Sequence, residues 1–286
     1  MNNDLVLTPG GFRSKQLVNA IEPGHALNLL ETGEFAKVEI ASKKVIARFA
    51  KPPALQPQFA AHGPNGAPKG SLAPPPGPSL PNGWQTYGGW DSGANSLSYF
   101  LTEWIVPPAP ATSSGQIIFL FNGIQNTGAN YGILQPVLQW GVSAAGGGAY
   151  WAVASWYVTS GGQAFHTNLV QVQPGAKLKG LMTQTGASGG HYNYSSTFRG
   201  IAHTTLPVNN IAVLHWANET LECYGLTKCS DFPATPGTLM GDIDIAIGKK
   251  HPKLNWTPVN AATSCGQHTV VASNANPNGK VDLFYK

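Results

Sequence analysis

The chain is poor in charge: only 10% of its 286 residues are Asp, Glu, Lys or Arg, well below the usual quarter. The formal net charge of +4 is spread thinly, with no run of Lys or Arg longer than a pair. A surface that follows phosphates needs clustered basic residues. Nucleic acid is therefore not expected as a partner.

Long apolar runs are also missing. No stretch of 18 apolar residues occurs, so no membrane-spanning helix is predicted and no membrane partner is expected. Residues 1–15 lack the basic start and apolar core of a secretory signal. Low charge, many aromatic and hydroxyl residues, and N-x-S/T sequons at Asn193, Asn218 and Asn255 nevertheless favour an extracellular protein.

Cysteine is scarce, and three residues cannot all pair within one chain. Cys223 and Cys229 are close enough across a Gly-containing turn to form a disulfide in an exported protein, which leaves Cys265 free. Three reduced thiols are the alternative. The spacing does not match the C-x2-C pairs of zinc sites, so no metal is expected.

Several catalytic motifs are absent, namely HExxH, the P-loop and GxGxxG. The segment 186–190 matches G-x-S-x-G, but a nucleophile elbow needs a strand before it and a helix after it. A glycine-rich hairpin is expected there, so Ser188 is interpreted as a turn residue. No motif predicts a cofactor.

Glycine and proline are abundant, at 34 and 23 residues, as in β-rich proteins with many turns. Residues 1–50 form a small N-terminal region, with short helical patterns at 15–21 and 25–30 and a strand-like stretch at 36–49. Residues 51–83 read as a Pro-rich linker, accessible to cleavage.

From about residue 84 to 248, short apolar or alternating runs are separated by Gly, Asn and Pro clusters. Ten strands without helices between them predict an all-β fold, an antiparallel two-sheet β-sandwich of the jelly-roll or concanavalin-like kind. Residues 249–286 are expected to pack on it as a C-terminal extension. The predicted strands are 98–106, 116–122, 132–140, 150–158, 168–172, 177–184, 192–198, 201–205, 212–224 and 241–247.

Few polar residues interrupt the apolar strands. Glu103, Glu219 and Glu222 are three of only 13 carboxylates in the chain, and Gln135 is the matching amide. Burial on a sheet face raises the pKa of a carboxyl into a range useful for catalysis. The alternative for each residue is an outward-facing polar side chain.

The order of five segments resembles the glutamic peptidases, or eqolisins. Asn122-Gly-Ile-Gln125 followed by Ile133-Leu-Gln135 is similar to the family's Gly-Ile-Asp-Gly segment and its Ile-Leu-Gln catalytic strand. Trp216-Ala-Asn-Glu219 falls where the family has Trp, two residues and a catalytic Glu. Neprosin-type glutamic peptidases, which use two Glu residues, are a more distant comparison. The remaining segments that carry the resemblance are 102–110, 150–157 and 170–178.

The resemblance implies an acid-acting endopeptidase with a Gln/Glu dyad on the concave face of a sandwich. Glu219 then activates a water and donates a proton to the leaving amine, while the Gln135 amide stabilises the oxyanion. Glu222 is a rival to Glu219, because it lies three residues on and a β-bulge could reverse which of the two faces the groove. The chain departs from the family at Phe121, Gln125 and His215.

The same resemblance implies a monomer that acts on polypeptide substrates, held by Trp140, Trp151, Trp156 and Phe121. The N-terminal region then resembles a propeptide, which makes the chain a zymogen.

Two other functions stay open. The first is a carbohydrate-binding or carbohydrate-cleaving jelly roll with Glu103 and Glu219 as its carboxylates. The second is a non-catalytic surface or adhesion module.

Overall fold

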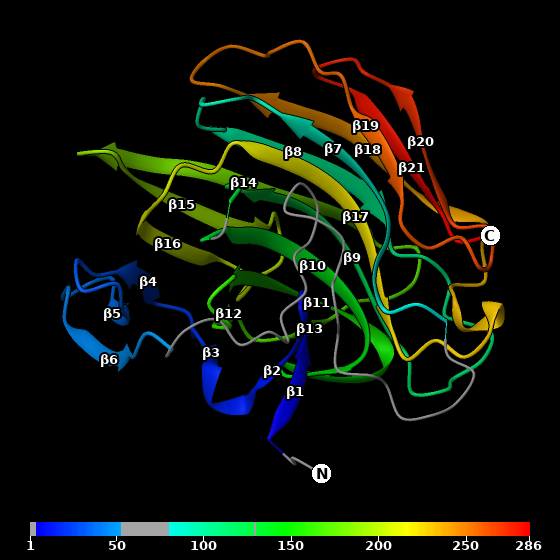
Figure 1. The fold of residues 1–286 in the computed structure, drawn as a ribbon, viewed down its shortest axis with the longest axis horizontal. Helices are drawn as coiled ribbons and strands as arrows, with labels where there is room; N and C mark the ends of the chain where they lie inside the picture. Colours follow the sequence, from blue (N-terminus) through cyan, green and yellow to red (C-terminus); the bar gives the residue numbers. More distant parts are fainter. Residues whose placement is uncertain (1–3, 53–79, 129) are drawn as a thin grey trace.

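In a computed structural model, which describes residues 4–52, 80–128 and 130–286, two large β-sheets pack face to face (Figure 1). This confirms the predicted all-β sandwich. Sheet I has nine strands, which are, from edge to edge, β19 (Thr257–Asn260), β7 (Gly83–Asp91), β17 (Trp216–Tyr224), β9 (Ile117–Gln125), β10 (Gly132–Ser143), β11 (Gly146–Thr159), β12 (Ala164–His166) and β3 (Val18–Ala20), with β13 (Val170–Gln171) also paired to β11.

Sheet II has ten strands, which are, from edge to edge, β20 (His268–Ser273), β21 (Gly279–Phe284), β18 (Gly237–Ala246), β8 (Tyr99–Ile105), β14 (Lys177–Ser188), β15 (His191–Phe198), β16 (Leu206–Ile211), β4 (His25–Leu29), β5 (Phe35–Glu39) and β6 (Val45–Phe49). A separate hairpin of β1 (Leu5–Thr8) and β2 (Gly11–Ser14) lies outside both sheets, beside β10 and β11 in Figure 1. The short 3-10 turns are η1 (Lys15–Leu17) and η3 (Cys229–Asp231).

The main core lies between the two sheets and is built by period-two alternation. Phe100 and Trp104 of β8 point inward from sheet II and join Leu120 and Leu138 of sheet I in one buried cluster. Sheet I also buries its other face, so β9 and β17 are buried at every residue. Because neither face of these strands is in contact with water, β9 is mostly an apolar run, and the polar residues of β17 are buried as well.

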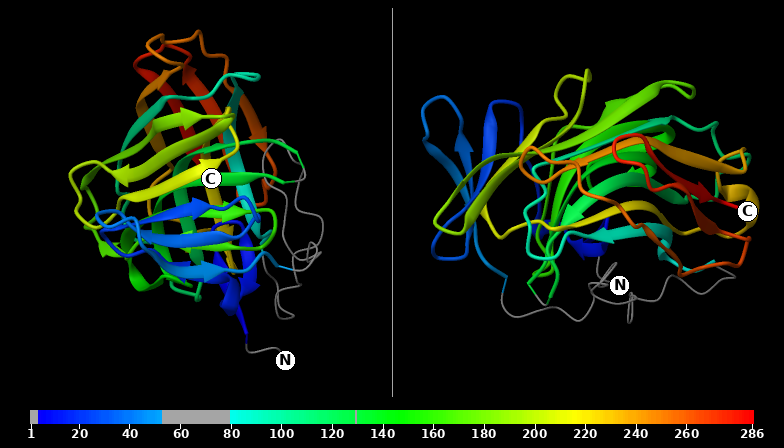
Figure 2. Two further views of the ribbon diagram at one scale, coloured as in Figure 1. Left: turned by 90° about the vertical axis from the view of Figure 1, so that its left-hand side faces the viewer. Right: turned by 90° about the horizontal axis from the view of Figure 1, so that it is seen from above.

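The helices predicted at 15–21 and 25–30 are wrong, because the strands β3 and β4 in these segments extend the two sheets instead. β3 pairs in parallel with β12, and β4 pairs in parallel with β16. Figure 2 shows β4, β5 and β6 continuing sheet II beyond β16. Edge strands expose unpaired backbone groups, and the gain from pairing them outweighs the weak helical preference of short segments. The stretch predicted at 36–49 is a hairpin of β5 and β6.

The C-terminal residues belong to the sandwich as well, because β19 adds to sheet I and β20 and β21 add to sheet II. The strand predicted at 201–205 is wrong, since β16 begins only at Leu206. Most of the expected linker, residues 53–79, lies outside the described residues.

The predicted disulfide is wrong: Cys229 pairs with Cys265, across a Cα–Cα distance of 5.5 Å. Cys223 is free and fully buried, because it points into the core from the middle of a sheet strand. A side chain facing between two sheets cannot reach a loop cysteine at the molecule's edge.

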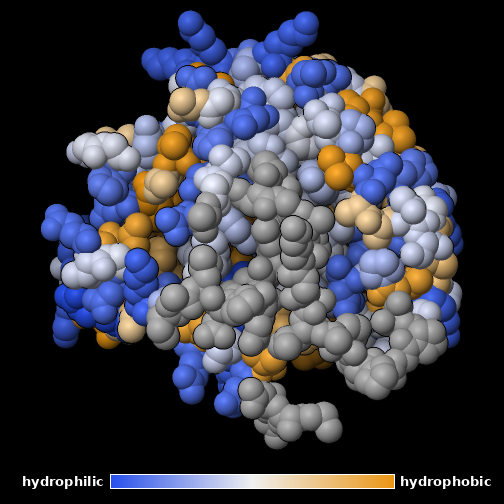
Figure 3. All heavy atoms as spheres, in the orientation of Figure 1, coloured by the Kyte–Doolittle hydropathy of each residue, from blue (hydrophilic) through white to orange (hydrophobic). Residues whose placement is uncertain are grey.

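On the face shown in Figure 3, apolar residues form separate small groups among polar ones. Within the described ranges, none of the helical segments is long and apolar enough to cross a bilayer.

Candidate functional site

The two faces of sheet I have different surroundings. Its inner face packs against sheet II and carries Ala217, Leu221 and Cys223 of β17. Its outer face carries a second apolar cluster, which includes Trp216 and Tyr224 of the same strand and residues of the N-terminal hairpin. Successive side chains of a strand point to opposite faces, so parity assigns every residue of β17 to one of the two.

Gln135 and Glu219 lie on opposite faces of sheet I. Glu219 has the parity of Ala217 and Leu221 and therefore faces the inner core. Gln135 has the parity of Ile133 and Val137, which belong to the outer cluster. The predicted dyad is therefore not assembled in this structure.

Glu219 is fully buried between the sheets. Its Oε1 accepts a hydrogen bond of 2.5 Å from the Thr102 hydroxyl on sheet II, while its Oε2 has no partner among the described residues. Burial raises the pKa of Glu219 well above its usual value, although the Thr102 hydrogen bond opposes the shift. A neutral carboxylic acid enclosed in a core has no path to a substrate.

Glu222 points to the outer face and is the only carboxylate that β9, β10, β11 and β17 place there. Its Oε1 accepts hydrogen bonds from the Tyr224 hydroxyl (2.5 Å) and from the backbone N–H of Gly10 (2.9 Å). Burial raises the pKa of Glu222 to about 7, against the effects of these two hydrogen bonds, of Arg13 and of a hydrogen bond from Trp84. Such a carboxyl can accept or release a proton near neutral pH.

The N-terminal hairpin covers this carboxyl. Gly10 lies in the hairpin turn, and Leu7 and Phe12 on either side of it pack with the outer cluster. Arg13 is completely buried and donates from Nη1 to the carbonyl of Thr159 at 3.0 Å. The hairpin therefore spans the outer face from Glu222 to the end of β11.

Two glutamine side chains on the outer face are buried without full hydrogen bonding. Gln135 Oε1, and both Nε2 and Oε1 of Gln125, have no partner among the described residues. The same is true of the indole Nε1 of Trp156, which lies directly across from Gln135 in the pairing of β10 with β11. Buried amides without partners cost about 1–3 kcal/mol each. They are the groups that a bound polar ligand satisfies.

The register separates Gln135 from Glu222. Asn218 shares the cross-strand row of Gln135, whereas Glu222 lies four residues further along β17. That offset is about 13 Å along the strands, with a further 10 Å or so for two strand spacings. Gln139 lies in the row of Glu222, but its amide N–H groups already donate to Gly141 and Gly146. Gln135 and Glu222 thus lie on the same face of sheet I without touching.

Two of the four aromatic residues predicted to bind substrate do not reach the outer face. Trp140 and Trp151 belong to the inner core, where their rings pack edge to face at 5.4 Å. Trp156 and Phe121 do belong to the outer cluster. The structure therefore places Trp140 and Trp151 between the sheets, because indole rings in strands are buried there as readily as they line a groove.

Glu103 points outward from sheet II and forms ion pairs with Lys177 and Lys179. Its burial raises the pKa, but the two lysines outweigh that effect and leave the pKa below its usual value. A carboxylate held ionised in this way is a poor proton donor. Glu103 and Glu219 also point to different faces of their sheets, so they do not form a glycosidase pair.

The hairpin residues Gly10 and Arg13 were not predicted as part of any site. Arg13 stands in a polar stretch, residues 13–16, and nothing in that stretch indicates that its side chain is buried or which strand it contacts. Among the described residues, no cluster of three or more His, Cys, Asp or Glu side chains is arranged to hold a metal ion.

No protein-family model matches the sequence, and a search of curated proteins finds no match. Ten chains of solved structures match. Scytalido-glutamic peptidase with a peptide-based transition state analog is 13% identical, with a TM-score of 0.46 over 71% of this chain and 100% of that one. The same peptidase with a transition state analog inhibitor is 14% identical, with a TM-score of 0.47 over 73% of this chain and 100% of that one.

A third structure, SCP-B of the eqolisin family with the tripeptide Ala-Ile-His, is 14% identical, with a TM-score of 0.42 over 71% of this chain and 100% of that one. At this level of identity the likeness concerns the fold alone, and it assigns no residue of the site.

Proposed function

We propose that the chain is an endopeptidase of the glutamic type, acting at acid pH, whose active face is the outer face of sheet I. One observation carries the proposal: a polypeptide backbone, that of Gly10, already lies against the buried carboxyl of Glu222 at 2.9 Å. The face therefore already accommodates a polypeptide backbone next to this carboxyl. The five segments that resemble glutamic peptidases support the same function.

In this proposal Glu222 replaces Glu219 as the acid and base. When the hairpin leaves, solvation lowers the pKa of Glu222 from about 7, so the carboxylate is available at acid pH to activate the attacking water and then to protonate the leaving amine. Gln135 cannot titrate, and its amide contacts the substrate main chain on the same face. The aromatic residues Trp156 and Phe121 supply apolar contacts to substrate side chains.

The hairpin Leu5–Ser14 blocks this face in the intact chain, so the proposal includes a zymogen. Phe12 packs edge to face on Tyr224 at 6.1 Å, and Gly10 occupies the hydrogen-bonding capacity of Glu222. A substrate competes with the hairpin for both. We also propose an extracellular monomer that acts on unfolded polypeptides.

The test is casein hydrolysis at pH 3–5 by the full-length chain, with the N-terminus of the protein followed over time. Glu222→Gln abolishes hydrolysis if Glu222 is the acid and base, while the matched variant Glu219→Gln retains it. If Glu219→Gln loses activity and Glu222→Gln retains it, the result supports the Gln135 and Glu219 dyad predicted from the sequence. Absence of hydrolysis by both the intact and the cleaved wild-type chain rejects a peptidase.

A non-catalytic binding module is the second candidate, because buried amides beside aromatic rings also bind sugars and peptides without reaction. Glycan binding that survives in Glu222→Gln, with no hydrolysis by the wild-type chain, supports it.

A further inference from the structure

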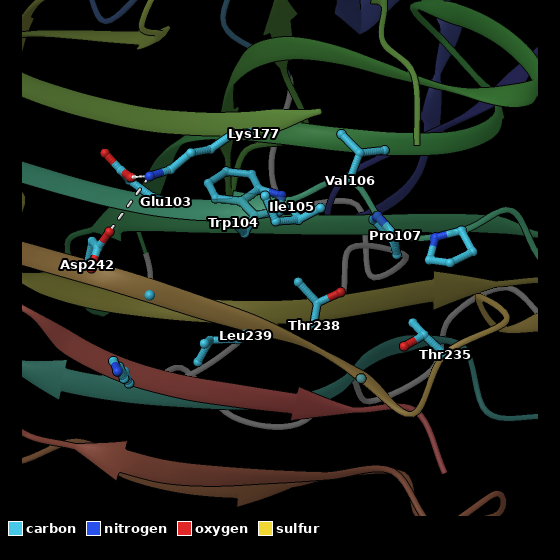
Figure 4. Close-up of a pocket in the computed structure, with 14 residues that line it drawn as sticks. Glu103, Trp104, Ile105, Val106, Pro107, Lys177, Thr235, Thr238, Leu239 and Asp242 are labelled. Carbon is cyan, nitrogen blue, oxygen red and sulfur yellow. Dashed lines mark ion pairs between the residues drawn. The ribbon is translucent and has the colours of Figure 1, made fainter. Parts of the chain in front are cut away.

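We propose a second binding site on the opposite side of the molecule, an opening in sheet II between β8 and β18 that receives an extended peptide strand. A cavity of about 480 Å³ lies there, lined by Trp104, Ile105, Val106 and Leu239 among others (Figure 4). It is independent of the outer face of sheet I, and its test does not depend on peptidase activity.

The opening arises because two neighbouring strands separate and then meet again. β8 and β18 pair where Gly241 faces Glu103. Beyond that pair no register joins them until Ala234 N–H reaches the carbonyl of Ala109, at 3.3 Å, beside the bridge between Pro110 and Pro233. The ladder is therefore interrupted over five residues of one strand, 104–108, and six of the other, 235–240, or roughly 16–20 Å.

Proline explains why the sheet does not close. Pro107 and Pro108 follow β8 directly and carry no N–H, so they cannot continue the ladder toward β18. On the other strand, a bulge between Gly241 and Asp244 turns the backbone, with Asp242 at a φ of 47°. Bulges bend a strand away from its neighbour.

Backbone groups point into the opening from both sides. The N–H of Val106 donates to the carbonyl of Ala176 and its carbonyl accepts from the N–H of Gly175, both in the turn before β14, so Ile105, one residue earlier, directs its own N–H and carbonyl toward β18. The carbonyl of Pro236 accepts a hydrogen bond from the N–H of Tyr285, on the side of β21. Gly237 and Leu239, which have the opposite parity, therefore direct their backbone N–H and carbonyl groups toward β8. Neither set has a partner across the opening.

The lining matches a neutral peptide. Glu103 and Asp242 are balanced by Lys177 and Lys280, and Lys177 points toward both acids at one end of the cavity in Figure 4. At the mouth Ile105 is 50% exposed and Leu239 is 45% exposed, so both offer apolar contact to an incoming side chain.

Trp104 lines the cavity as well, and its indole Nε1 is buried with no hydrogen-bond partner among the described residues. An extended strand supplies both the carbonyl oxygens and the N–H groups that such an opening lacks. Main-chain bonding of this kind gives affinity, and alternate side chains give specificity. The geometry therefore points to a short extended segment with uncharged, alternately apolar residues.

The experiment is a titration of the ¹⁵N-labelled full-length protein with acetyl-Val-Thr-Val-Thr-amide, followed by NMR. The expected result is a saturable shift of the amide signals of Ile105, Gly237 and Leu239, with at least tenfold weaker binding when alternate peptide nitrogens are methylated. Equal binding of the methylated peptide, or shifts confined to other residues, overturns the proposal.

A variant provides the second arm. Leu239→Pro removes the N–H that faces the opening and leaves the bonds to β21 in place, so binding weakens at least tenfold. Leu239→Ala, which keeps the backbone donor, weakens it much less. Unchanged binding to a folded Leu239→Pro protein refutes the site, as does self-association through this opening in place of peptide binding.

Discussion

Gln135 and Glu219, the residues that the resemblance pairs, project from opposite faces of one sheet. Glu219 instead meets Thr102 of the facing sheet. In our proposal the carboxyl chemistry therefore falls to Glu222, and Glu219 has an effect on stability that depends on pH.

Glu219 makes the fold most stable in acid. Its native pKa is raised above the unfolded value of 4.5, so its contribution to stability is fully present below pH 4.5 and is lost as the pH rises through the native pKa. Urea unfolding at pH 4 and pH 8 measures the loss, and Glu219→Gln reduces the difference in unfolding free energy between the two pH values. An unchanged pH dependence in this variant contradicts a buried protonated Glu219.

The hairpin docks more tightly at low pH. Docking buries Glu222 and holds its pKa near 7, so the docked state binds the proton more strongly than a solvated one. Raising the pH through 7 weakens docking by at most about tenfold per pH unit. Hydrogen exchange of the Gly10 amide, corrected for intrinsic rates, is therefore faster at pH 8 than at pH 5 and depends little on pH in Glu222→Gln. Slower exchange of the Gly10 amide at pH 8 than at pH 5 would be the opposite result and would contradict a coupling between hairpin docking and protonation of Glu222.

Arg13→Ala weakens the hairpin and leaves the Glu222 side chain in place, although it removes a nearby positive charge that lowers the pKa of Glu222. The variant loses the bond to the Thr159 carbonyl and a fully buried side chain, so the hairpin detaches more readily. We expect at least a few-fold faster casein hydrolysis by the uncleaved chain, and the exposed variant Lys15→Ala serves as the control. Slower hydrolysis by a folded Arg13→Ala protein argues that the hairpin supports the site instead of blocking it.

Gln135→Ala separates two roles of the amide. Because the register sets Gln135 about 13 Å along the strands from Glu222, we expect a several-fold rise in KM with little change in kcat. A fall in kcat of about a hundredfold or more, the effect of losing an oxyanion donor, assigns the amide to the reacting carbonyl.

The disulfide contributes through the loop it closes. Cys229 and Cys265 are 36 residues apart, and closing such a loop is worth about 3–4 kcal/mol. The double variant with Ser at both positions is expected to lose most of this free energy of unfolding, as measured by thermal unfolding. In the folded wild-type protein, Cys223 is the free thiol and is buried, so alkylating reagents that do not enter the core leave it unmodified. Rapid alkylation of Cys223 in the folded protein contradicts its burial.

The sandwich could be predicted because its strands alternate or run apolar between turns, as the segments around Phe100 and Met182 do. The face of the sheet to which Glu219 and Glu222 each point could not be predicted. β17 is buried on both faces, so its sequence pattern does not distinguish inward from outward residues. What covers the outer face is a hairpin more than two hundred residues away in sequence. No local property of β17 indicates that contact.

The N-terminal strands were missed for a related reason. Residues 25–30 have an apolar pattern that fits one helical turn or a strand equally well, and the free edge of β16 decides between them. The free edge itself follows from the order of strands in sheet II, which a single sequence does not display. Similarly, Cys223 was paired by proximity in sequence, although its strand directs the thiol into the core.

The N-terminal strands join different sheets, β3 at the edge of sheet I and β4 with β5 and β6 at the end of sheet II, and that has a consequence for any cut between residues 53 and 79. Leu27, Phe35 and Ala36 are buried in the shared interior, so the severed N-terminal piece stays attached by backbone ladders and apolar packing. Denaturing electrophoresis then reports two polypeptides where gel filtration reports one particle. Cleavage of the chain and dissociation of the N-terminal piece are therefore separate events. Dissociation requires that the pairing of β3 with β12 and of β4 with β16 be broken together.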